Sequence, residues 1–143
     1  MRTLTSAADR ETAVAPGIGY GHNGRMPLTI DQHEQAGCAV LALHGDLDVA
    51  TAPALTTAAF AAVESAPRHI VVDARELDFC DSTGLAVFVR MAAQLKPYGL
   101  NLAVAGAQPI VRRILEVSGL DEAFVVTATI HEATDQLTAG ASS

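Results

Sequence analysis

Two short segments of the sequence concentrate carboxylates and hydroxyls. Gly45-Asp-Leu-Asp48 follows one apolar run, and Cys80-Asp-Ser-Thr-Gly84 comes a few residues after another. Both apolar runs are typical of strands buried on two faces of a parallel sheet. Loops at the carboxyl ends of such strands form the functional crevice of an open α/β sheet. We therefore expect the two segments to lie side by side and to bring their carboxylates and hydroxyls together.

Ser82 is the residue in these segments that is best placed for chemistry. Apolar residues recur at helical spacing from Leu85 to Leu95, before Pro97, which predicts a helix beginning at Ser82. Its hydroxyl is expected at the N-cap, beside unpaired backbone N–H groups and the positive end of the helix dipole. The start of a helix can hold an anion. Plain helix capping by Asp81 or Ser82 is the alternative interpretation.

Strand and helix signals alternate along the chain. Strands are predicted at 28–34, 38–43, 69–73, 100–105 and 124–127. Helices are predicted between 51 and 67, 82 and 97, and 109 and 119, and from 129 onward, where Thr129 and Glu132 match a capping box. We expect residues 74–81 to form a loop. The buried face of the third helix is predicted to consist of Ile110, Ile114 and Val117.

The order ββαβαβαβα predicts a single α/β domain. Its sheet should be mixed and mostly parallel, with one antiparallel edge strand from the first hairpin, and about four helices should pack on it. The domain is expected at residues 27–138. Residues 1–26 lack helical or strand periodicity and are expected to form a flexible tail, and residues 139–143 a disordered one.

Charge and composition narrow the class of partner. The formal charge of −7 creates a field that repels phosphate backbones and anionic headgroups, so we expect neither a nucleic acid nor a membrane as partner. No apolar leader begins the chain and no stretch reaches the length of a membrane span, which favours the cytoplasm. Lys96 is the only lysine and precedes Pro97 at a helix end, where a cation suits the helix dipole.

We expect neither a metal nor a cofactor. Cys38 and Cys80 are too few and too far apart for a zinc cluster. Cys80 is expected to be a packed thiol, because the neighbouring carboxylate of Asp81 raises the pKa of a thiol. The histidines are scattered over elements that do not converge.

An enzyme is the first competing interpretation. Ser82 could be a nucleophile, with His44 as its base and Asp46 or Asp48 orienting the imidazole. Against this, the nucleophile motif Gly-x-Ser-x-Gly is absent. We therefore predict that the protein is not an enzyme.

A receiver-like domain is the second competing interpretation. Asp46, Asp48, Asp73 and Asp81 could gather around a magnesium ion. That chemistry usually needs a lysine at a strand end, and the sequence offers none there.

The block Asp73 to Leu85, preceded by Ile70-Val-Val and by Gly45-Asp-Leu-Asp48, resembles the STAS family of bacterial anti-sigma factor antagonists. The resemblance extends over about residues 28–138. It implies a regulator that binds an anti-sigma factor with ATP-dependent serine kinase activity and thereby frees a sigma factor. Phosphorylation ends this binding, and a serine/threonine phosphatase restores it. Such partner switching serves transcription regulation in stress response and sporulation.

The resemblance also assigns residues. It implies that Ser82 is the phosphoacceptor, with Thr83 as the adjacent alternative, that Asp48 lies beside the acceptor, and that Asp81 positions the loop. The partner-binding surface it implies consists of Asp46, Asp48, Asp81, Ser82, Thr83 and Gly84. Ala86 stands where the family often has a second glycine, and Thr83 where a second serine is commoner, which bears on partner specificity rather than on the acceptor.

A STAS domain without a kinase is the remaining alternative. In that case the same crevice would meet a scaffold protein or a small molecule. The intact Asp-Ser-Thr-Gly-Leu sequence favours the kinase-linked form.

Overall fold

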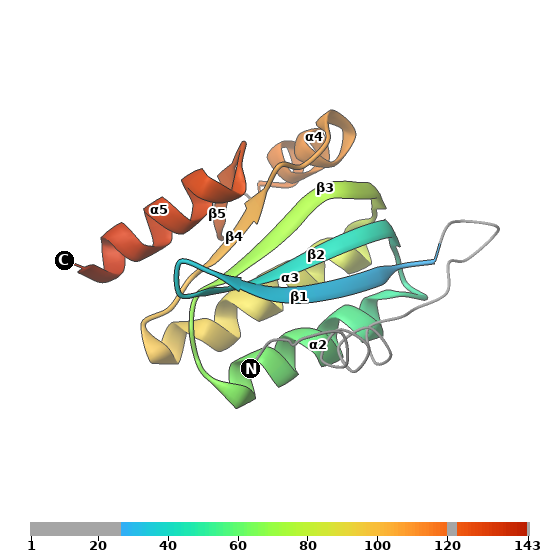
Figure 1. The fold of residues 1–143 in the computed structure, drawn as a ribbon. Coiled ribbons are helices and arrows are strands. Elements are labelled where there is room, and N and C mark those ends of the chain that lie inside the picture. Colours follow the sequence, from blue (N-terminus) through green and yellow to red (C-terminus); the bar gives the residue numbers. More distant parts are fainter. Residues whose placement is uncertain (1–26, 120–122, 143) are drawn as a thin grey trace.

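The computed structural model describes residues 27–119 and 123–142. Within them the chain forms a mixed sheet of five strands in the order β1-β2-β3-β4-β5, with four α-helices packed on it (Figure 1). The strands are β1 (Thr29–Gln35), β2 (Cys38–Leu47), β3 (Ile70–Cys80), β4 (Leu102–Ala105) and β5 (Val125–Thr127). The helices are α2 (Ala52–Ser65), α3 (Ser82–Leu95), α4 (Pro109–Ser118) and α5 (Ile130–Ser142), and the 3-10 turn η2 (Lys96–Tyr98) follows α3.

The predicted fold class is confirmed. β1 pairs with β2 in antiparallel fashion, and the three other neighbouring pairs are parallel. Sequence order and strand order coincide, as expected for a chain that alternates strand and helix. The predicted tail at residues 1–26 lies outside the described residues. At the other end α5 continues to Ser142, past the boundary of 138 expected for the domain.

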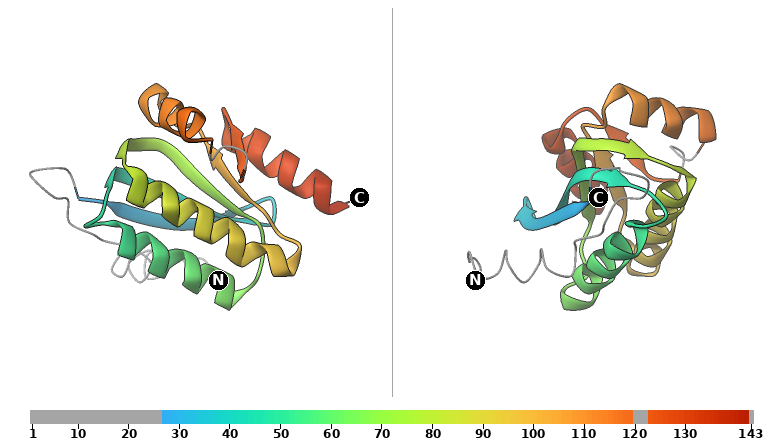
Figure 2. Two further views of the ribbon diagram at one scale, coloured as in Figure 1. Left: turned by 180° about the vertical axis from the view of Figure 1, so that it is seen from behind. Right: turned by 90° about the vertical axis from the view of Figure 1, so that its right-hand side faces the viewer.

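Two apolar layers enclose the sheet. One face packs on α2 and α3 through a core that includes Leu41, Val72 and Phe88. The opposite face packs on α5 through a smaller cluster that includes Val40 and Leu137. Figure 2 shows α2 and α3 side by side on one face and α5 on the other. The central strands are therefore buried on both faces, as their continuous apolar runs predict.

The two central strands are longer than the sequence predicts. β2 continues to Leu47 and β3 continues to Cys80, so the loop expected at residues 74–81 is wrong. Register shifts between Ala42 and His44, and between Gly45 and Asp46, break the alternation of the strands here. Such irregularities place polar and apolar residues out of the regular period of two, which makes the sequence look like a loop.

The expected face of α4 is also wrong. Val111 and Leu115 are buried, whereas Ile110 and Val117 are 57% and 76% exposed and Ile114 is half-buried. The apolar residues cover an arc of this helix wider than the sheet can contact, so spacing alone does not select the buried side. The capping interaction of α5 is present, because Thr129 Oγ1 accepts a hydrogen bond from the Glu132 N–H at 3.0 Å.

Candidate functional site

The two segments singled out in the sequence lie side by side at one edge of the sheet. Leu47 at the end of β2 is in register with Cys80 at the end of β3. Just beyond them, the Asp81 N–H donates a hydrogen bond to the Leu47 carbonyl at 3.2 Å. α2 and α3 both begin here, so the segment after β2 and the segment after β3 are neighbours, as predicted.

The turn between β2 and α2 is held together by its own polar groups. The Thr51 hydroxyl is completely buried, donates to the Asp46 carbonyl at 2.9 Å, and accepts from the Asp48 N–H at 2.9 Å. The Asp48 Oδ1 accepts from the N–H groups of Ala50 and Thr51 at 3.0 and 3.1 Å. An aspartate that satisfies the N–H groups ahead of a helix is a typical turn device. These contacts fix residues 46–51 as one rigid turn.

The two predicted carboxylates of this turn point into the protein. Asp46 and Asp48 are only 6% and 3% exposed. Within the described residues, Asp48 Oδ2 is buried without a hydrogen-bond partner. Asp48 therefore belongs to the segment next to the one that carries Ser82, but it shapes the turn from within.

Helix α3 begins at Ser82, but its N-cap is Asp81 rather than Ser82. Asp81 has an extended backbone, with φ −101° and ψ −173°, and its Oδ1 accepts a hydrogen bond from the Gly84 N–H at 3.1 Å. Ser82 is thus the first helical residue, and its side chain is exposed, whereas Thr83 is half-buried. The N–H groups of this first turn have no acceptor within the helix. The exposed hydroxyl consequently lies at the positive end of the helix dipole.

Gly84 and Cys80 attach the start of α3 to the sheet. A Cβ on Gly84 would lie 2.7 Å from Leu47 Cγ and 2.9 Å from Cys80 Sγ, so only glycine allows this approach. Cys80 is fully buried, and burial, with a smaller contribution from the Asp81 carboxylate, raises the pKa of its thiol to about 12. Cys80 is a packed thiol, as the sequence predicts. Burial raises its pKa more than the Asp81 carboxylate does.

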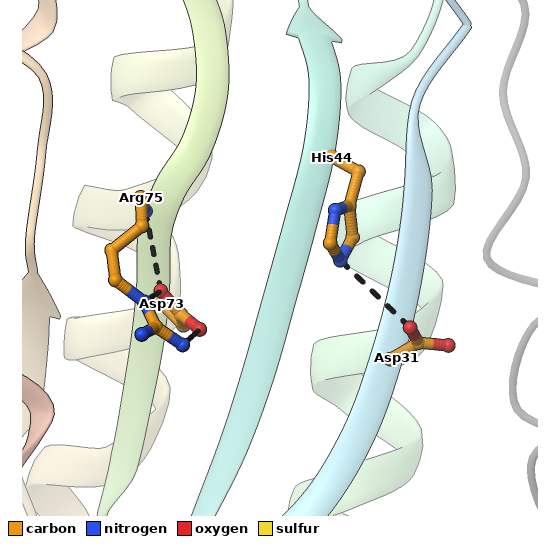
Figure 3. A network of polar contacts seen from close by, with 4 residues as sticks. All are labelled: Asp31, His44, Asp73 and Arg75. Carbon is orange, nitrogen blue, oxygen red and sulfur yellow. Dashed lines mark hydrogen bonds and ion pairs between the residues drawn. The ribbon is translucent and has the colours of Figure 1, made fainter.

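The groups required by the two competing interpretations have other partners. His44 lies 3.8 Å from Asp31 of β1, measured from Nε2 to Oδ2, and its ring points toward that strand (Figure 3). Arg75 holds both carboxylate oxygens of Asp73, at 2.9 and 2.8 Å. Burial alone would raise the pKa of Asp73, but the hydrogen bonds and charge of Arg75 outweigh it and lower the pKa. Within residues 27–119 and 123–142, no hydrogen bond joins Ser82 to His44, and no metal-binding carboxylate cluster includes Asp73.

Residues 27–119 and 123–142 contain no group of three or more His, Cys, Asp or Glu side chains placed to hold a metal ion. A shallow groove of about 390 Å³ lies between α4, β5 and α5, and none of the predicted site residues lines it. Its charged side chains already have partners, since Arg112 pairs with Glu116 at 3.9 Å and Asp135 with His131 at 3.3 Å.

No helix in the described part of the chain is both long and apolar enough to cross a membrane.

Fold and sequence together define the family. Residues 30–127 match the family model described as Mlab, STAS domain, which is most of the chain. The protein therefore belongs to the STAS domain family. Its sequence is 28% identical over 106 residues to the anti-sigma-F factor antagonist RsfB of Mycobacterium tuberculosis, covering 74% of this chain and 86% of RsfB.

Solved structures agree with this assignment. An anti-sigma factor antagonist from Mycobacterium paratuberculosis superposes with a TM-score of 0.69 and 28% identity, covering 78% of this chain and 94% of that one. The fold is shared with SpoIIAA, at 22% identity. Its unphosphorylated form gives a TM-score of 0.66 over 77% of this chain and 96% of SpoIIAA. The phosphorylated form, described as a Bacillus cell fate determinant, gives 0.59 over 75% and 97%.

Proposed function

We propose that this protein is an anti-sigma factor antagonist whose unphosphorylated form binds an anti-sigma factor with serine kinase activity and whose Ser82 is the phosphoacceptor. The observation that carries the proposal is the exposed Ser82 hydroxyl at the first residue of α3, within the Asp-Ser-Thr-Gly-Leu sequence. Relatives named as anti-sigma factor antagonists support it, and so does SpoIIAA, whose structure is known in a phosphorylated form.

The geometry favours Ser82 over Thr83 as acceptor. A kinase must place its nucleotide in line with the hydroxyl oxygen, which requires an accessible side chain. Ser82 is exposed, whereas Thr83 is half-buried. The domain tolerates a phosphate on Ser82, because the first N–H groups of α3 and the helix dipole stabilise an anion there.

The same phosphate would oppose binding. It adds about −1.5 to −2 charges to a site that already contains the Asp81 carboxylate. A partner fitted to the neutral serine would have to desolvate that charge or move away from it. Phosphorylation can therefore weaken the complex without a change of fold, and a serine/threonine phosphatase would restore binding by removing the phosphate.

Phosphate transfer from ATP tests the acceptor. Each anti-sigma factor of the ATPase-kinase class encoded in the same genome would be purified and incubated with wild type, Ser82→Ala and Thr83→Ala. The matched control is Thr83→Ala, because it removes the neighbouring hydroxyl. We expect incorporation into wild type and Thr83→Ala and none into Ser82→Ala. Equal incorporation into Ser82→Ala would show that the acceptor lies elsewhere.

Partner binding tests the switch. The Kd of the anti-sigma factor would be measured for the unmodified protein and for protein phosphorylated stoichiometrically at Ser82. We expect binding to weaken about 5- to 150-fold, the range typical of coupling between a modification and a binding site. If no anti-sigma factor binds or modifies wild type, the protein would instead be a STAS module for a scaffold protein or a small molecule.

A further inference from the structure

The turn that leads from β2 into α2 buries its polar side chains and exposes apolar ones. Its polar side chains, Asp46, Asp48 and Thr51, are buried, while Val49 between them is 59% exposed. Ala50 and Pro53 are exposed as well. We refer to Val49, Ala50 and Pro53 as the apolar cap. A buried polar group together with an exposed apolar one is the informative departure from the usual pattern of burial.

The apolar cap lies beside Ser82. Val49 comes two residues after Leu47, and Ser82 comes two residues after Cys80, which is the register partner of Leu47. The hydrogen bond from the Asp81 N–H to the Leu47 carbonyl holds the two chain segments together. Val49 and Ser82 thus both follow the carboxyl ends of two neighbouring parallel strands, and both residues are exposed there.

The cap is also rigid before any partner arrives. Thr51 bonds to Asp46 and Asp48, and Asp48 bonds to the N–H groups of Ala50 and Thr51, so the backbone on both sides of Val49 is fixed. A surface that is already ordered loses little conformational entropy on binding. Interface residues that dominate affinity cluster near the centre of an interface, in well-packed pockets from which water is excluded.

We propose that Val49 is the apolar anchor through which the partner docks, and that the partner presents an apolar recess beside the Ser82 acceptor. This inference rests on the proposed function and goes further, because it assigns recognition to the apolar cap rather than to the carboxylates of Asp46 and Asp48. Both residues are buried, and the Asp48 carboxylate accepts the N–H groups of Ala50 and Thr51 within the turn. A dry apolar contact beside Ser82 also explains why a dianion at that serine would be so unfavourable, since the phosphate would have to be desolvated.

Matched substitutions at exposed apolar positions test the proposal. The anti-sigma factor that binds wild type would be titrated against Val49→Ser, Val49→Leu, Val117→Ser and Ser82→Asp. Val117, on α4, is 76% exposed and serves as the control for loss of an apolar surface side chain. We expect Val49→Ser to weaken binding about tenfold or more, Val49→Leu to retain it, and Val117→Ser to leave it unchanged. Thermal unfolding of the free proteins should be the same in all, because the substituted side chains are exposed.

The outcomes separate the two proposals. If Ser82→Asp weakens binding and Val49→Ser does not, Val49 is not the anchor, and the proposed function stands without it. If Val117→Ser weakens binding as much as Val49→Ser, the effect is not specific to the cap, and the inference is also overturned. If no anti-sigma factor binds wild type, both proposals fall.

Discussion

Gly84 packs against Leu47 so closely that a Cβ at position 84 would stand 2.7 Å from Leu47 Cγ. Through this contact the first turn of α3 sits directly on the end of β2. The position of Ser82 relative to the turn after β2 is therefore set by this close packing together with the hydrogen bond from the Asp81 N–H to the Leu47 carbonyl.

Gly84→Ala should destabilise the protein, because the methyl group must displace Leu47 or Cys80. Overpacking of this kind costs about 1–3 kcal/mol of unfolding free energy. Urea denaturation measures it. In the double variant Leu47→Ala/Gly84→Ala the space is available, so the combined cost should be smaller than the sum of the single costs. Strict additivity would argue against the packing contact.

Asp81→Ala should lower the unfolding free energy by about 1 kcal/mol, the usual cost of an N-cap side chain. The loss arises because the Gly84 N–H no longer has its acceptor in the Asp81 carboxylate. Asp81→Asn is the matched control, since asparagine caps about as well as aspartate. Denaturant melts of the three proteins decide the point, and an equal loss in both variants would indicate that the charge of Asp81, not the cap, stabilises α3.

Thr51→Val should cost about 1–3 kcal/mol of unfolding free energy, although it keeps the shape of the side chain. The change removes the hydroxyl that bonds to the Asp46 carbonyl and the Asp48 N–H, and leaves both groups buried without that partner. Thr57→Val on the exposed side of α2 is the control and should have little effect. Similar denaturation midpoints for the two variants would contradict the bridging role of Thr51.

His69 should make the protein sensitive to mild acid. Burial lowers the pKa of its imidazole, whose Nδ1 accepts a hydrogen bond from the Asn101 N–H at 3.0 Å. The unfolded chain, with a histidine pKa of about 6.5, then binds a proton more readily than the folded one. This contribution to stability is complete above about pH 6.5 and is lost as the pH falls below that value.

NMR titration and denaturation measure this effect. The ring of His69 should titrate below the ordinary histidine value of about 6.5, and His69→Asn should reduce the loss of stability between about pH 7 and pH 5. A His69 ring that titrates at or above about pH 6.5 would refute the prediction.

The sequence predicts the element order, the strand directions and the meeting of the two site segments because these depend on strong local signals. Continuous apolar runs identify β2 and β3, and Pro53 and Pro109 mark helix starts. The ends of β2 and β3 are less predictable, since register shifts near Gly45 disturb the period of two. The choice between Ile110 and Val111 as the buried side of α4 depends on the direction from which the sheet approaches, which spacing does not specify.

The candidate site also has features that the sequence predicts and features that depend on tertiary contacts. The positions of Asp81 and Ser82 follow from the helix start, although which of the two caps the helix depends on the extended backbone of Asp81. The inward orientation of Asp48 depends on the buried hydroxyl of Thr51, a tertiary contact that the sequence does not display. The sequence does not single out Val49, because one apolar residue in a polar turn is common. Only the structure does so, by burying Asp48 and Thr51 on either side of it.

The hydrogen bonding inside the turn before α2 separates two kinds of position within a few consecutive residues. Asp48 and Thr51 maintain the backbone, and substitutions there disturb the whole edge. The side chains of Val49 and Ala50 lie on the surface and take no part in those hydrogen bonds, which use only the backbone of Ala50. Variation at these two positions can accumulate without a cost in stability. Duplicated copies of such a domain can therefore come to differ at this exposed surface while the edge that carries the serine stays the same.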